Sequence, residues 1–169
     1  MLIPGWHPLV VHFPFALCIT GTLALAASRL ARGDRLAATL ATVGTWNLFA
    51  GAVAALAAIG TGLAALIDLH VGLAAHQAIL VHVKWAILTS TTLLLLAVWR
   101  GAGNAHDARP SWALLTMLLL ASAAMAVTGY RGDVNVYRFG IGVSRNASES
   151  TRMPASLPAS PSPPAAPAG

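Results

Sequence analysis

Charged side chains are scarce in this chain. Asp, Glu, Lys and Arg make up 9% of its 169 residues, whereas hydrophobic residues make up 57%. A soluble domain carries roughly 25% charged residues, so this chain has too few to cover a water-facing surface. The composition argues against a soluble domain and indicates that lipid is the main solvent.

Cysteine is scarce too, and several chemical motifs are missing. A single cysteine, Cys18, excludes an intramolecular disulfide. No CxxCH sequence is present, which excludes a covalent c-type haem site. A phosphate loop, an HExxH sequence and a G-x-S-x-G elbow are also absent, so a soluble-type hydrolase is not expected. Because no residues form an evident acid–base pair, a membrane subunit is favoured over a standalone enzyme.

The positive charge does not indicate nucleic-acid binding. The formal net charge is +5, but the arginines are scattered between apolar runs and form no basic stripe. Four apolar runs are present, at about residues 9–28, 37–60, 76–99 and 111–130. Each approaches or exceeds the roughly 20 residues that cross a bilayer. The sequence therefore predicts an all-α integral membrane four-helix bundle whose partner is the lipid bilayer.

The ends and loops of the chain extend this prediction. The membrane domain is expected over residues 1–145, with a short outer C-terminal segment and a disordered Pro/Ala/Ser-rich tail over 146–169. No Lys or Arg precedes the first run, so we expect a retained span and not a cleaved signal peptide. The first and third loops carry arginines and the second loop carries none. The positive-inside rule then places these two loops in the cytoplasm and both termini outside.

Two histidines lie inside apolar runs, where an ionisable side chain is costly and usually functional. His12 lies in the first run and His82 in the third. Both runs enter from the same membrane face, and the two residues lie about 6 Å and about 9 Å along their helices. Histidines on facing helices of a bundle are a common way to hold a b-type haem. The sequence predicts His12 and His82 as axial ligands, with His7 and His76 in reserve.

Other uses of these residues stay open. A copper or zinc ion would also accept His12, His82 and Asp68 as ligands. A proton relay is a further option, and the histidines could instead have only a structural role. A haem-binding subunit would need a redox partner or a membrane complex to exchange electrons with, whereas the alternative is a non-redox structural or transport subunit.

The chain resembles a known family along most of its length. The segment 7–17 is similar to the HPxxVHFPxAL opening of the DUF2231 family, and 130–143 is similar to its GGxLVYxHGVGV ending. Asp133 stands where that family usually has a second glycine, and Phe139 where it often has histidine. The resemblance implies a bacterial four-span membrane protein, which we expect in the inner membrane, and assigns no activity. The glycines of the ending predict a short extended turn over the outer mouth of the bundle.

Overall fold

The computed structural model describes residues 6–67, 69, 71–103 and 109–142. Within them the chain forms four α-helices, which are α1 (Trp6–Leu30), α2 (Asp34–Ile67), α3 (Leu73–Ala102) and α4 (Trp112–Phe139). All four are long enough and apolar enough to cross a membrane. The predicted all-α four-helix fold is thereby confirmed for this part of the chain. The predicted tail, 146–169, lies outside the described residues.

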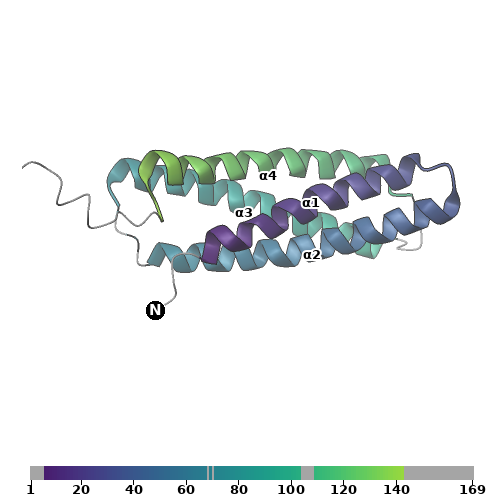
Figure 1. Cartoon of the computed structure of the whole chain (residues 1–169), viewed down its shortest axis with the longest axis horizontal. Helices are drawn as coiled ribbons and strands as arrows, with labels where there is room; N and C mark the ends of the chain where they lie inside the picture. Colours follow the sequence, from purple (N-terminus) through teal and green to yellow (C-terminus); the bar gives the residue numbers. More distant parts are fainter. Residues whose placement is uncertain (1–5, 68, 70, 104–108, 143–169) are drawn as a thin grey trace, which may run out of the picture.

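The helices run antiparallel to their neighbours in chain order (Figure 1). Each helix packs against the one before and the one after, and α4 returns to α1, so α1 and α3 lie on one diagonal of the bundle. The starts of α1 and α3 lie at the same end as the last turns of α2 and α4 (Figure 1). We call this the histidine end, because it holds His7 and His82, and we call the opposite end the arginine end, because it holds Arg100.

Interior positions recur every seven residues on all four helices. A seven-residue repeat keeps one face of each helix towards the bundle axis over many turns. The buried residues that follow it are Pro14, Gly21 and Ser28 on α1; Ala37, Gly44, Gly51 and Ala58 on α2; Thr89 and Leu96 on α3; and Leu114 and Ala121 on α4. This register determines which polar side chains can reach the interior.

The interface between α1 and α2 is the most extensive in the bundle. Its glycines leave the two backbones almost in contact, since a Cβ added to Gly44 would lie 2.9 Å from the carbonyl oxygen of Gly21. A Cβ added to Gly51 would lie 3.3 Å from the Cβ of Leu17. Lipid tails are as apolar as leucine, so close packing of small residues drives helix association in a membrane.

At the arginine end a charged side chain is buried between helices. Arg100, in the last turn of α3, is 6% exposed. Its Nε donates a hydrogen bond of 3.1 Å to Thr45 Oγ1 on α2. The Thr45 hydroxyl in turn donates to the carbonyl of Ala41. Such interhelical hydrogen bonds are a usual way to bury polar groups in a membrane bundle.

The end of α4 differs from the sequence expectation. Residues predicted to make an extended turn continue the helix through Phe139. Gly140 then ends it in the left-handed conformation, with φ of 64°, and its N–H donates to the carbonyls of Asn135 and Val136. A glycine at this position satisfies the last carbonyls of a helix. The glycines therefore mark the end of a helix, and the predicted extended turn over the mouth of the bundle is wrong for residues up to Phe139.

We predict that Gly44→Ala lowers the free energy of unfolding by about 1–3 kcal/mol, the usual cost of overpacking. Its Cβ would meet backbone atoms of Gly21 and Leu25, which cannot move independently of α1. Gly60→Ala is the matched control on the same helix, because nothing lies within 4 Å of its added Cβ. Denaturation by SDS in mild detergent, followed by circular dichroism, measures both; equal stability of the two variants would contradict the close α1–α2 approach.

Candidate functional site

Two imidazole rings meet at the histidine end of the bundle. The ring centroids of His7 and His82 lie 6.5 Å apart, and the ring planes cross at 79°. His7 comes from the first turns of α1 and His82 from α3, so the pair spans the diagonal of the bundle. Both side chains are half-buried.

His7 is anchored on α2. Its Nδ1 lies 3.0 Å from the carbonyl oxygen of Ala58 and 3.2 Å from Thr61 Oγ1. The ring lies against Gly62, where an added Cβ would come within 2.9 Å of the ring carbon Cε1. The missing side chain of Gly62 therefore makes room for the imidazole.

His82 is anchored on α4 in the same way. Its Nδ1 lies 3.1 Å from the carbonyl oxygen of Thr128. A Cβ added to Gly132, one turn further along α4, would lie 3.3 Å from Cε1 of the ring. The Thr128 hydroxyl is 3.0 Å from that of Thr89 on α3, which links the same two helices one layer deeper. Each imidazole thus has one carbonyl and one glycine on a neighbouring helix.

These contacts determine the tautomer of both rings. A carbonyl oxygen can only accept a hydrogen bond, so Nδ1 carries the proton in each neutral ring. Nε2 is then the nitrogen with a free lone pair, and no hydrogen bond in the described part of the chain uses it. An Nδ1–H bound to a backbone carbonyl is the usual arrangement behind a histidine that binds a metal through Nε2.

The other candidate residues lie elsewhere. His12 is exposed, and its Nδ1 is 2.6 Å from the carbonyl oxygen of Pro8 on its own helix. His76 is exposed near the start of α3, and Asp68 lies outside the described residues. Over the described ranges, no group of three or more His, Cys, Asp or Glu is placed to hold a metal ion. The structure thus brings His82 together with His7, the reserve ligand, and not with His12.

Helix rotation explains this difference. His7 lies seven residues before the buried Pro14 and so follows the interior register of α1. His12 lies five residues after His7, which rotates it about 140° around the helix. Depth along the helix was the basis for pairing His12 with His82, and depth does not report which face a residue occupies.

Sequence reasoning missed one polar residue of this region. Asn135, on α4, is 7% exposed, and its Oδ1 has no hydrogen-bond partner in the described structure. It follows Gly132 by three residues and Thr128 by seven, so it shares their face of α4. Side chains on a helix lean towards its N-terminus, so that of Asn135 leans back towards Gly132 and the imidazole pair. The seven-residue register was the signal that could have identified it.

The family of the chain follows from a comparison with protein-family models. A model described as a predicted membrane protein, DUF2231, matches residues 4–145. The chain belongs to this family. The matched range includes all four helices and both paired imidazoles. No curated protein and no solved structure matches the chain significantly.

We predict that His7 and His82 are both Nδ1–H tautomers in the neutral state. The carbonyls of Ala58 and Thr128 accept from Nδ1 and stabilise that form. Nitrogen-15 NMR of the imidazoles in lipid vesicles distinguishes protonated from unprotonated ring nitrogens. A dominant Nε2–H signal from either residue would contradict the anchoring described above.

Proposed function

We propose that this DUF2231 protein is a membrane subunit that binds a b-type haem between α1 and α3 and exchanges electrons with a membrane partner. The supporting observation is the neighbouring pair of His7 and His82, each with Nδ1 hydrogen-bonded to a carbonyl and with no hydrogen bond to Nε2 in the described part of the chain. These residues replace the pair His12 and His82 as the proposed axial ligands.

The spacing of the rings agrees with this proposal. Metal–nitrogen bonds to imidazole are about 2.0–2.1 Å long for zinc, so two histidines that shared one metal ion would have their ring centres within roughly 6 Å of one another. The centroids of His7 and His82 are 6.5 Å apart. The separation of the two rings is therefore close to what two histidine ligands of one iron would need.

The number of ligands favours haem over a bare ion. A structural zinc ion takes four protein ligands, whereas haem iron takes four nitrogens from the porphyrin and two from the protein. The described chain offers the two imidazoles without a third His, Cys, Asp or Glu grouped with them. A site with two protein ligands suits haem, because the porphyrin supplies the other four nitrogens.

Asn135 supports the presence of a bound group at this end. A buried acceptor without a donor is rare in folded proteins, and a water or a ligand usually completes it. Asn135 Oδ1 is such an acceptor within the described structure. It lies on the face of α4 that carries the anchors of His82, between the imidazole pair and the end of the bundle.

Haem content of purified variants tests the proposal. The wild-type protein, made in haem-replete cells, should carry near-stoichiometric haem with sharp α and β bands in a reduced-minus-oxidised spectrum. His7→Ala and His82→Ala should each remove an axial ligand and reduce haem content by about tenfold or more, since even the loss of a residue that only orients a ligand costs about that much affinity. His12→Ala is the matched control and should keep wild-type haem content, because His12 is exposed and bound to its own helix.

Two results would overturn the haem assignment. One is a colourless protein that takes up no haem on reconstitution; the other is loss of haem in His12→Ala with retention in His7→Ala. Elemental analysis of the same samples detects copper or zinc. If metal and haem are both absent, the alternative is a non-redox structural or proton-handling subunit, since the histidines already link α1 to α2 and α3 to α4.

The arginine distribution supports an orientation with the histidine end outside a bacterial inner membrane. At the arginine end, Arg32 and Arg109 lie in loops and Arg35 lies in the first turn of α2, whereas the loop at the histidine end holds no Lys or Arg. Gly33→Cys and Gly72→Cys provide matched reporters, because both glycines are exposed with nothing near an added Cβ.

An impermeant maleimide applied to intact spheroplasts should label Gly72→Cys and leave Gly33→Cys unlabelled. The native Cys18 is buried and gives little background. Labelling of Gly33→Cys alone would indicate the opposite orientation, with the arginine end outside.

A further inference from the structure

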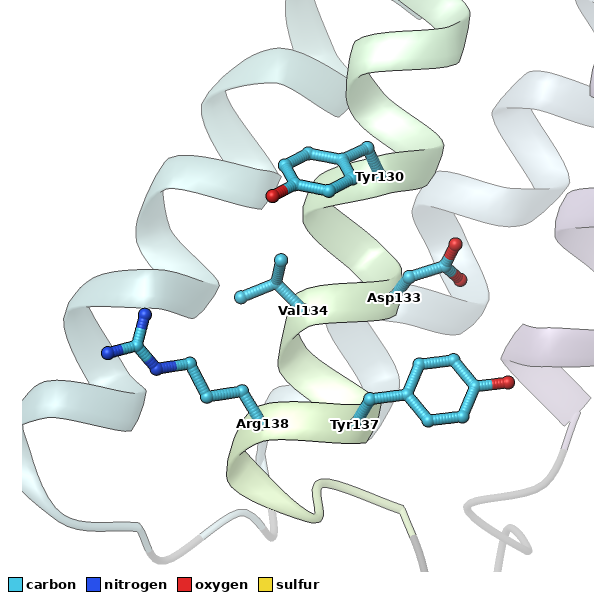
Figure 2. Close-up of a pocket in the computed structure, with 5 residues that line it drawn as sticks. All are labelled: Tyr130, Asp133, Val134, Tyr137 and Arg138. Atoms are coloured by element: carbon cyan, nitrogen blue, oxygen red, sulfur yellow. The ribbon is translucent and has the colours of Figure 1, made fainter.

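A shallow hollow lies on α4 near the histidine end. Its volume is about 310 Å³, and it is lined by Tyr130, Asp133, Val134, Tyr137 and Arg138. All five side chains come from the last turns of one helix (Figure 2). Tyr137 is 87% exposed and Tyr130 is 64% exposed. The hollow therefore opens to the surroundings of the bundle and not to its interior.

The hollow lies on the opposite side of α4 from the imidazole pair. Thr128, Gly132 and Asn135 form the interior face there. The residues of the hollow fall between these positions, on a stripe about 180° away around the helix. A ligand of the hollow is therefore independent of the proposed haem.

Its tyrosines indicate the depth at which the hollow lies. They occur where the apolar part of α4 gives way to a turn with Arg131, Asp133 and Arg138. Tyrosines at such a boundary of a membrane helix sit at the level of the lipid headgroups. The hollow thus meets the bilayer where phosphates and ammonium groups are concentrated.

The hollow also carries one charge of each sign. Neither Asp133 nor Arg138 forms an ion pair with another residue in the described ranges. The Arg138 guanidinium lies 5.7 Å from the ring centre of Phe139, which leaves its N–H groups available. In Figure 2 Arg138 and Asp133 project to the two sides of Val134, so their charges stay separated across the hollow.

We propose that this hollow binds the headgroup of a phospholipid with a primary ammonium group, such as phosphatidylethanolamine. The Arg138 guanidinium donates to the phosphate oxygens, for which its planar fork is suited. The Asp133 carboxylate accepts hydrogen bonds from the ammonium group. The rings of Tyr130 and Tyr137 flank the headgroup and attract its positive charge.

The charge pattern favours this lipid over the other common classes. An anionic glycerol headgroup would satisfy Arg138 but would offer only neutral hydroxyls to Asp133, so the attraction between opposite charges would be lost there. A choline headgroup has no N–H to donate to Asp133, so it loses that hydrogen bond. Only a zwitterion that ends in a primary ammonium uses both charges of the hollow.

Lipid retention measured by native mass spectrometry tests the proposal. The wild-type protein is equilibrated in mixed micelles with equal amounts of phosphatidylethanolamine, phosphatidylglycerol and phosphatidylcholine, and the retained lipids are counted. We expect wild-type protein to retain phosphatidylethanolamine about fivefold over the others, the ratio that corresponds to one exposed charged contact. Asp133→Asn should abolish the preference over phosphatidylcholine, because the carboxylate is its cause.

Arg138→Gln should reduce retention of all three lipids, and Arg138→Lys should restore part of it. Arg131→Gln is the matched control, since Arg131 is exposed on the same helix but does not line the hollow. Circular dichroism of each variant verifies that the helices are intact. Equal retention by the Arg138→Gln and Arg131→Gln variants, or a wild-type preference for phosphatidylglycerol, would overturn the proposal.

Discussion

The close approach of α1 and α2 is the constraint on which the rest of the structure depends. Gly21 and Gly44 bring the two backbones together midway along the helices. The same seam, by which we mean the line of close α1–α2 contacts, continues through Gly51 and ends at Gly62. There the imidazole of His7 on α1 packs against the glycine on α2. Because the seam determines both the height and the rotation of α1, it also determines where His7 lies. A change in the middle of the seam would therefore displace the imidazole at its end.

The site is best understood as a polar layer at one end of a mainly apolar bundle. Deeper layers have leucine and alanine at the interior positions, such as Leu96 and Ala121. In the last layers the same register carries His7, His82 and Asn135. Glycines opposite the two imidazoles offset the added volume, so the layer keeps its packing. Polar groups at interior positions are costly in lipid, and their collection in one layer is the physical basis for assigning a function to it.

The apolar runs of the sequence predict how many helices there are, whereas the seven-residue register predicts which face of each helix lies inside the bundle. Long uncharged runs predicted the number of helices because a bilayer demands about 20 apolar residues from each. The family resemblance came from the opening and ending motifs, which also contain His7 and Gly132. The partner of His82 was not predictable from depth, since His12 and His7 differ mainly in rotation around α1. The end of α4 was also predicted wrongly, because glycines near a helix terminus indicate a cap and a turn equally well. In the structure the N–H of Gly140 donates to the carbonyls of Asn135 and Val136, which makes this glycine a cap.

The anchoring of each imidazole has a consequence for how the protein is assembled. His7 is held by α2 and His82 by α4, and α1–α2 and α3–α4 are the two most extensive interfaces of the bundle. Each helical hairpin thus orients one ring through a contact within that hairpin. The two rings become neighbours only when the second hairpin docks on the first. A ligand that joined them would act as a cross-link between the two hairpins, and its binding energy would add directly to the stability of the docked state.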